Sequence, residues 1–231
     1  SLVGSEMCIR DRPLAVAPPV PFTRLAKNGK CAILGFRNTM SRIALISDIH
    51  ANLPALEAVM KDIEQLQCDA VYCLGDIVGY NANPSECLEF IRSRQIPTVR
   101  GNHDEEAIGE DNPAGMNPVA YSALMWTRQQ LSDEQKKWLR RAPFQRILPN
   151  EIVLVHATQD KPNSWAYVTN VDTATHSINM LRDNQFLCFN GHTHVPRTFI
   201  RHEGSIQEYE SGDIQPVSYT HLRAHETPEH L

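Results

Sequence analysis

The sequence predicts an α/β domain in which short strands alternate with helices. Two observations support this prediction. From Met40 onward, apolar runs of strand length alternate with stretches whose apolar residues recur with the period of a helix. Five of the predicted strands also run into Asp, Asn or His residues, and the carboxyl ends of strands are where ligands gather in open α/β sheets.

The first half of this region contains three predicted strands and two predicted helices. The helix after the first strand has Asn52 as its expected N-cap and Pro54 in its first turn. The second helix begins at Pro84. The strands share a short apolar run that leads directly to a polar segment: 42–47, 70–75 and 96–100.

The second half contains three predicted helices and five predicted strands. Ser132 is the expected N-cap of the second helix. The helices are expected at 119–130, 132–141 and 173–181. The strands form a hairpin around Pro149, a single strand, and a second hairpin joined by Gly204: 145–149 with 151–156, 186–194, and 197–203 with 205–210.

The composition restricts the classes of function. Of the 231 residues, 42% are hydrophobic and 21% are charged, as in ordinary soluble globular proteins. A formal charge of -5 gives no indication of a nucleic-acid partner, which usually needs a basic face. No apolar run reaches the length of a membrane span. The six cysteines include no CxxC pair, so we expect reduced thiols in a cytoplasmic protein, and the oligomeric state stays open.

The two ends of the chain differ from the rest. Residues 1–12 and 216–227 can be encoded, codon by codon, by opposite strands of one DNA sequence, and the pair resembles translated sequencing-adapter sequence. We therefore predict a non-native or disordered leader at 1–39, one domain at 40–215 and a non-native tail at 216–231. A natural C-terminus lost near residue 215 would truncate the fold and expose a sheet edge.

Seven residues at or just after the strand ends form a candidate metal site. Carboxylate, imidazole and amide ligands without a thiolate suit Mn, Fe, Zn or Co. Seven ligands exceed the four of a tetrahedral zinc ion, which indicates two ions with a shared ligand. The residues are Asp48, His50, Asp76, Asn102, His156, His192 and His194.

The local spacing of these ligands demands bends in the chain. Alternate residues of a strand point to opposite sides, so the Asp-x-His and His-x-His pairs each need a turn, and 52–54 is the expected turn for the first pair. Gly75 and Gly101 precede two of the ligands, and we expect them, with Gly191, where the backbone approaches the metals closely. Trp165, in the loop after His156, is a candidate for the border of the pocket.

Taken together, the motifs resemble those of one known family. Across residues 41–215 the order Asp-x-His, Gly-Asp, Gly-Asn-His-Asp, His and Gly-His-x-His resembles the calcineurin-like metallophosphoesterase superfamily. The segments SDIHANLPALEAV, CLGDIVGYNANP, VRGNHDE, LVHAT and NGHTHVPR look like its small bacterial and archaeal phosphoesterases. The resemblance implies a four-layer α/β/β/α sandwich with a dinuclear metal site at the strand ends.

The resemblance also implies a role for each residue. Four ligands would hold the first metal: Asp48, His50, Asp76 and His194. Asp76 would bridge to the second metal, which Asn102, His156 and His192 would complete, and a bridging hydroxide would be the nucleophile. His103 would be the general acid for the leaving oxygen or a donor to a phosphate oxygen. Asp104 would either orient the His103 imidazole or serve as an ordinary helix-start carboxylate.

The predicted function is that of a metal-dependent phosphoesterase acting on phosphodiesters or small phosphomonoesters. Mn is the first choice of metal, and Fe, Zn, Ni and Co are the alternatives. Gly79 and Tyr80 stand where Ser/Thr protein phosphatases of the superfamily carry an Asp and an Arg, which argues against phosphoproteins and dinucleotide polyphosphates as substrates. The alternative from another class is a non-catalytic metal-binding scaffold on the same fold.

Overall fold

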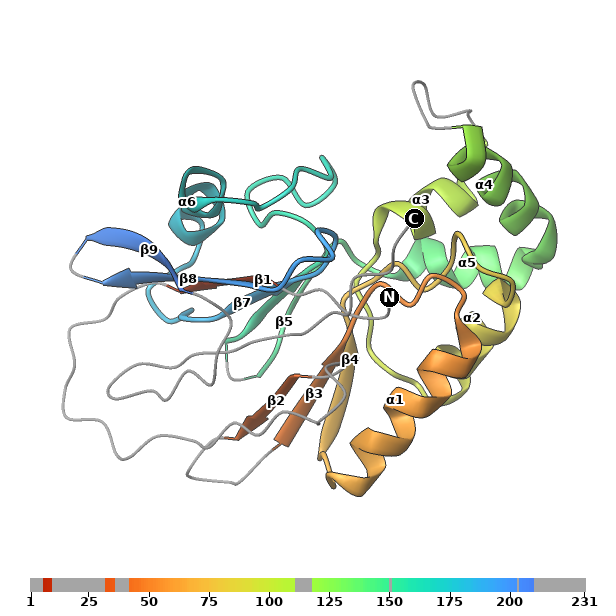
Figure 1. Ribbon diagram of the computed structural model, residues 1–231, viewed down its shortest axis with the longest axis horizontal. Coiled ribbons are helices and arrows are strands. Elements are labelled where there is room, and N and C mark those ends of the chain that lie inside the picture. The colour runs from red at the N-terminus through yellow and green to blue at the C-terminus, as the bar shows by residue number, and fades with distance from the viewer. Residues whose placement is uncertain are drawn as a thin grey trace.

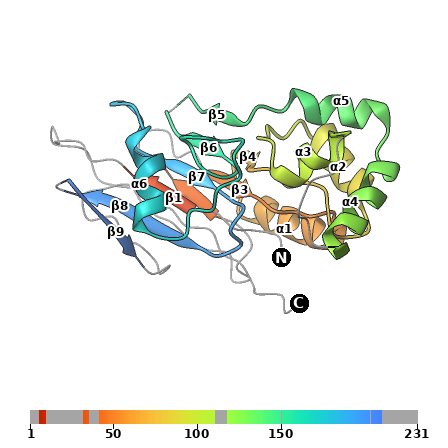
Figure 2. The same cartoon turned by 90° about the horizontal axis from the view of Figure 1, so that it is seen from above.

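The computed structural model describes residues 6–9, 32–35, 42–110, 118–149, 151–202 and 204–209. Within them, two β-sheets lie between a group of helices on one side and a single helix on the other, and this α/β architecture has the four layers that the family resemblance implies (Figure 1). Figure 2 shows helices α1 to α5 grouped at one end of the molecule and α6 at the other. The predicted tail and most of the predicted leader lie outside the described residues.

The smaller sheet has the strand order β2-β3-β4. Strand β3 (Arg42–Ile46) pairs antiparallel with β2 (Ala32–Gly35) and parallel with β4 (Ala70–Cys73). The strand predicted at 96–100 is reduced to a single bridge between Cys73 and Thr98. It ends there because the N–H that would continue the ladder after that of Val99, the N–H of Gly101, donates to Asp104 Oδ2 instead of to a strand.

The larger sheet has the strand order β5-β6-β7-β1-β8-β9, with β1 antiparallel to β7 and parallel to β8. Strands β1 and β2 both fall inside the predicted leader, so part of that leader pairs with the domain, and the domain boundaries stay a prediction. The six strands are β1 (Glu6–Ile9), β5 (Gln145–Ile147), β6 (Val153–Val155), β7 (Cys188–Asn190), β8 (Arg197–His202) and β9 (Ser205–Tyr209).

Capping side chains satisfy a first-turn N–H group in three of the described helices, α1, α5 and α6. Asn52 accepts from Ala55 N at 3.2 Å at the start of α1. Asn170 caps α6, which begins at Val171, two residues before the expected position. The short helix α3 was not among the predicted elements. The helices are α1 (Leu53–Gln65), α2 (Pro84–Ser93), α3 (Asn102–Ile108), α4 (Pro118–Gln130), α5 (Asp133–Arg141) and α6 (Val171–Asn179).

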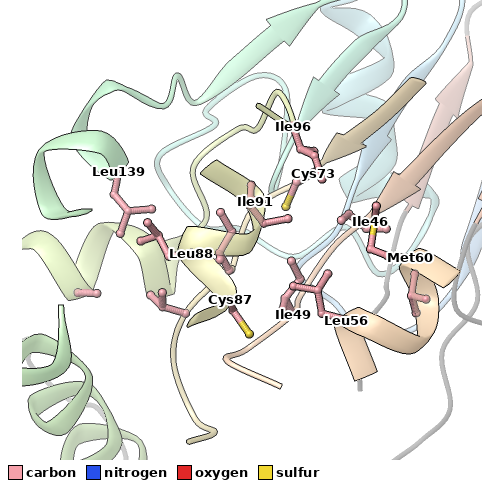
Figure 3. Packing of buried hydrophobic residues seen from close by; sticks show 14 of the residues in the cluster. Ile46, Ile49, Leu56, Met60, Cys73, Cys87, Leu88, Ile91, Ile96 and Leu139 are labelled. Atoms are coloured by element: carbon pink, nitrogen blue, oxygen red, sulfur yellow. The ribbon is translucent and has the colours of Figure 1, made fainter. Parts of the chain in front are cut away.

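Side-chain alternation along the strands builds three apolar layers. In β3, Ile43 and Leu45 pack between the two sheets, whereas Ala44 and Ile46 pack against the cluster of α1 and α2. Figure 3 shows this second cluster, in which Leu88 of α2 lies beside Leu139 and Ile91. On the other face of the larger sheet, β6 and β7 pack against α6. The layers hold the strand ends of both sheets at one place.

Two further predictions can be compared with the described residues. Cys73 and Cys188 are buried in the core, and both thiols are free, as are those of Cys68 and Cys87. None of the described helices combines the length and the apolar character that crossing a membrane requires.

We predict that Leu88→Ala lowers the free energy of unfolding by roughly 2–5 kcal/mol, because it leaves a cavity in the cluster between α2 and the smaller sheet. Urea denaturation followed by circular dichroism measures this change. Glu89→Ala is the neighbouring control, since the Glu89 side chain is half exposed and its replacement should change stability by about 0.5 kcal/mol or less. Equal destabilisation by both substitutions would contradict the packing in Figure 3.

Candidate metal centre

Loops that follow strands of both sheets meet at the candidate site. The backbone N–H of Asp48 donates to Gly75 O at 3.1 Å, and that of His50 donates to Asp76 O at 2.9 Å, which joins the loops after β3 and β4. The N–H of His192 lies 3.2 Å from both carboxylate oxygens of Asp48, which joins the loop after β7 to the loop after β3. The site therefore spans the two sheets.

The bends that the spacing demands lie within the ligand residues themselves. Five of the seven candidate ligands have a left-handed backbone, which costs free energy in a residue other than glycine. The turn expected at 52–54 is thus wrong in position: Asp48 and His50 already bend the chain, and Asn52 serves instead as the cap of α1. The five residues are Asp48, His50, Asp76, His192 and His194, with φ between 48° and 74°.

The first group of candidate ligands contains Asp48, His50 and His194. The Nε2 atoms of His50 and His194 are 3.0 Å apart, and His194 Nε2 lies 3.2 Å from Asp48 Oδ1. His50 Nε2 lies 3.9 Å from the same oxygen and 3.9 Å from Asp76 Oδ2. Three donor atoms that point at one small volume are what a divalent cation requires.

The second group contains Asp76, His156 and His192. His156 Nε2 lies 3.2 Å from Asp76 Oδ2, the oxygen that also faces His50 of the first group. The contact lacks hydrogen-bond geometry, so this buried nitrogen has no hydrogen-bond partner. Asp76 is thereby placed between the two groups.

Backbone carbonyls determine which ring nitrogen of each histidine is free. His156 Nδ1 donates to Leu74 O at 2.7 Å, and His192 Nε2 donates to Trp165 O at 2.9 Å. A longer contact of 3.4 Å joins His50 Nδ1 to Val78 O. A carbonyl only accepts, so each of these nitrogens carries a proton. The other ring nitrogen is then the one that can bind a metal, once any proton on it has left.

Asn102 and His103 begin helix α3 beside these groups. Asn102 Oδ1 is buried and has no hydrogen-bond partner among the described residues. The His103 ring lies 4.8 Å from the His50 ring, and its ring nitrogen forms a third cluster with His50 and Asp76. Geometry alone therefore leaves His103 open as a ligand or as a proton donor.

Asp104 has a different role from the one implied for it as an orienting partner of His103. Its Oδ1 accepts from Ile77 N at 2.9 Å and from Val78 N at 3.2 Å, and its Oδ2 accepts from Gly101 N at 3.1 Å. It is the third residue of α3, so the alternative of a helix-start carboxylate describes it better. It holds the loop after Asp76 against the start of α3.

Charge in the site is balanced between carboxylates and imidazoles. Burial opposes ionisation of Asp48, but the hydrogen bond from His194 and the charge of His156 lower its pKa to about 2. Burial is likewise outweighed at Asp76, where His156 and His103 hold the pKa far below its usual range. Both carboxylates are thus ionised at neutral pH.

Burial and neighbouring charges shift the pKa values of the histidines and of Asp104 in different directions. Burial lowers the pKa of His50 to about 3, and burial with the charge of His156 lowers that of His192 to about 4. At His156 the carboxylate of Asp76 outweighs burial and raises the pKa to about 9. Burial and the charge of Asp76 raise the pKa of Asp104 to about 7.

The glycines before two ligands permit one loop to touch the other, and the expected close approach of the backbone to the metals stays a prediction. A Cβ on Gly101 would lie 2.1 Å from Asp76 Oδ1, and one on Gly75 would lie 2.6 Å from Gly101 N. Gly79 likewise leaves room for the His103 ring, because a Cβ on Gly79 would lie 2.8 Å from His103 Nδ1. Side chains at these positions would separate the segments that carry the ligands.

The residues present fit a pair of divalent cations. The donors are carboxylate, imidazole and amide groups with no thiolate, and two of them, His156 Nε2 and Asn102 Oδ1, are buried without a hydrogen-bond partner. All seven predicted ligands lie in this region, which the sequence alone could not establish. Their roles as ligands stay a prediction.

A cavity of about 220 Å³ opens over the cluster, and two tyrosines line it. Tyr80 is one of the two residues that depart from the phosphatase motif, whereas no sequence signal distinguished Tyr167 from a surface tyrosine. Tyr167 stacks on the His192 ring with 4.2 Å between centroids. Trp165 is not part of the cavity lining and contributes its carbonyl oxygen to His192 instead.

Comparison with known proteins gives a consistent result. Residues 41–221 match the family model described as calcineurin-like phosphoesterase superfamily domain. The chain is 35% identical over 175 residues to the uncharacterized protein MJ0912 of Methanocaldococcus jannaschii, covering 72% of this chain and 70% of that protein. A solved metallophosphoesterase from Sphaerobacter thermophilus is 36% identical with a TM-score of 0.62, covering 79% of this chain and 74% of that one.

We predict that Gly101→Ala lowers both metal content and stability, because its new methyl group would displace the Asp76 carboxylate. An overpacked substitution of this kind costs roughly 1–3 kcal/mol. Gly109→Ala is the matched control, since the nearest atom to a Cβ there is 3.5 Å away. Elemental analysis and urea denaturation measure the two effects, and indistinguishable variants would contradict the close approach of the loops.

We predict that metal binding releases about one proton per chain at pH 7.5. With a pKa of about 9, His156 holds a proton in the metal-free protein, and this proton must leave before Nε2 can bind a cation. Metal affinity should therefore fall as the pH drops from 9 to 7. Calorimetric titration in two buffers with different ionisation enthalpies measures the release. Enthalpies that do not depend on the buffer would refute it, and His156→Gln should reduce the release.

Proposed function

The chain belongs to the calcineurin-like phosphoesterase superfamily, and from this premise we propose that it hydrolyses phosphodiesters or small phosphomonoesters at a centre of two divalent cations. Membership in the family makes the chain a metal-dependent phosphoesterase hydrolase. The observation that carries the proposal further is the position of Asp76. Its Oδ2 lies within 3.9 Å of His50 Nε2 in one ligand group and 3.2 Å from His156 Nε2 in the other.

In this proposal the ligands divide into two sets that share Asp76. The first set is Asp48, His50 and His194, and the second is Asn102, His156 and His192. Bound cations would activate a water molecule as the nucleophile and place positive charge against the phosphoryl oxygens. Mn²⁺ is the first ion to test, since oxygen and imidazole donors without thiolate suit it, and Fe, Zn, Ni and Co are the alternatives.

His103 is the proposed general acid. It lies in the lining of the cavity, and the Nδ1 side of its ring faces Gly79, which leaves Nε2 as the nitrogen for the substrate. As the oxygen of water bonds to phosphorus and the bond from phosphorus to the ester oxygen breaks, the Nε2 proton of His103 passes to that leaving oxygen. The attacking water gives up one proton to the solvent, and His103 regains a proton from the solvent before the next turnover. The products are an alcohol and a phosphate with one ester group fewer.

The backbone of His103 supports this role as well. Its N–H donates to Asp76 Oδ1 at 2.9 Å, so the acid and the shared carboxylate are held in one arrangement. Asp104, two atoms of which accept three backbone N–H groups, keeps the start of α3 against the Asp76 loop. Asp104 is thus proposed as a positioning residue and not as a proton carrier.

We predict that the protein reconstituted with Mn²⁺ hydrolyses bis-p-nitrophenyl phosphate and that His103→Ala lowers kcat by roughly 10²–10⁴-fold. Metal content separates the two roles that geometry leaves open for His103. A general acid can be removed without loss of metal, whereas His156→Ala should lose metal together with activity.

His176→Ala, in an exposed residue of α6, is the matched control and should change neither quantity. Loss of metal from His103→Ala would make His103 a ligand rather than the acid. Absence of hydrolysis with each of Mn, Ni, Co and Zn would overturn the enzymatic proposal.

A further inference from the structure

The cavity over the candidate metal centre offers a substrate no cationic side chain. Among the described residues that line it, the polar groups are imidazoles, phenols, an amide, a hydroxyl and the Asp76 carboxylate, with no lysine or arginine. Proteins that bind a phosphoryl group with a second negative charge commonly supply Arg or Lys for it. A phosphomonoester carries that second charge near neutral pH, whereas a phosphodiester carries one.

The carboxyl group of Glu106 also makes the surroundings of the cavity less favourable for a substrate with two negative charges. Glu106 Oε2 is buried and has no hydrogen-bond partner among the described residues. Burial raises the pKa of Glu106, and the charges of His103 and Arg128 lower it. Burial, with the charges of Asp76 and Glu106 among others, raises the pKa of the Tyr80 and Tyr167 phenols. Among the described residues, the side chains that line the cavity therefore add no lysine or arginine to the proposed cations for a second negative charge on the substrate.

The two tyrosines present apolar faces beside different parts of the site. The Tyr80 ring lies 4.5 Å from the His103 ring and 4.8 Å from the His50 ring. The Tyr167 ring stacks on His192 with an angle of 12° between the planes. Both side chains are large and more than half exposed, at 52% and 55%. Exposed aromatic rings at the mouth of a cavity mark a surface that a flat apolar group can cover.

A phosphodiester has two ester groups, and the two rings match them. We propose that the pocket selects phosphodiesters over phosphomonoesters and prefers flat aromatic ester groups, with Tyr80 contacting the leaving group and Tyr167 the ester group that stays on phosphorus. The assignment of Tyr80 follows from its contact with His103, since the acid must lie beside the leaving oxygen. This inference rests on the proposed function and adds a substrate class to it.

The selection has a consequence for the product. Hydrolysis of a diester breaks one P–O ester bond, joins the water oxygen to phosphorus and releases one alcohol, which leaves a monoester with a second ionisable oxygen. That dianion is the species that the pocket accepts poorly. One equivalent of alcohol should therefore form per diester, and the monoester should accumulate.

Three substrates with the same leaving group test the inference: bis-p-nitrophenyl phosphate, methyl p-nitrophenyl phosphate and p-nitrophenyl phosphate. Wild-type kcat/KM should be roughly tenfold or more higher for the bis-aryl diester than for the monoester. Tyr167→Leu should lower the ratio of bis-aryl to methyl-aryl kcat/KM by roughly three- to tenfold, through KM. Tyr80→Leu should lower kcat/KM for both diesters by the same factor, since the two diesters share a leaving group.

Tyr209→Leu is the control, because Tyr209 is an exposed tyrosine on β9, away from the cavity lining, and it should leave all ratios unchanged. Melting temperatures show whether each variant is folded. Equal use of monoester and diester, release of two equivalents of p-nitrophenol, or an unchanged ratio in Tyr167→Leu would overturn the substrate class and leave the phosphoesterase proposal standing. No hydrolysis of any of the three substrates would overturn the proposed function itself and this inference with it.

Discussion

The candidate metal centre depends on one constraint, the burial of Asp48 and Asp76 at the place where the two sheets meet. Two carboxylates that are withdrawn from water repel one another and lose hydration, so they need positive partners and N–H donors close by. The protonated imidazole of His156 supplies positive charge at Asp76 in the metal-free chain, and the His194 imidazole lies 3.2 Å from Asp48 Oδ1. The backbone N–H groups of His103 and His192 donate to the two carboxylates. Divalent cations would meet the same need more completely.

This constraint explains why the loops are held in strained conformations. Five candidate ligands adopt a left-handed backbone that only glycine adopts at low cost. The surrounding contacts keep them there: the Asp48 and His50 N–H groups bond the neighbouring loop, and Asp104 ties that loop to α3. The apolar layers on both sides stabilise the strands, and the strands present the strained residues at one point. Stability and the site are thus built from different residues of the same segments.

The candidate ligands and the proposed substrate contacts lie in different parts of the fold. The ligands follow strands whose ends the layered fold brings together, whereas the tyrosines lie in connecting loops. Loops vary without disturbing the layers, so contacts to the substrate can differ between relatives that share one set of ligands. The contacts of Tyr80 with His103 and of Tyr167 with His192 join the loops to the metal centre, because each tyrosine ring packs directly on a histidine of the site.

The sequence by itself determined most of the order of strands and helices from residue 42 onward, apart from α3 and the segment 96–100, together with the caps at Asn52 and Ser132 and the seven candidate ligands. It could do so because apolar periodicity, capping side chains and strand-end motifs are local properties of the chain. Only the tertiary structure decided the rest. That Asp104 bonds three backbone N–H groups, that Gly101 must admit the Asp76 carboxylate and that Tyr167 covers His192 are contacts between distant segments. Such contacts leave no local pattern, since they arise only when the two sheets have packed.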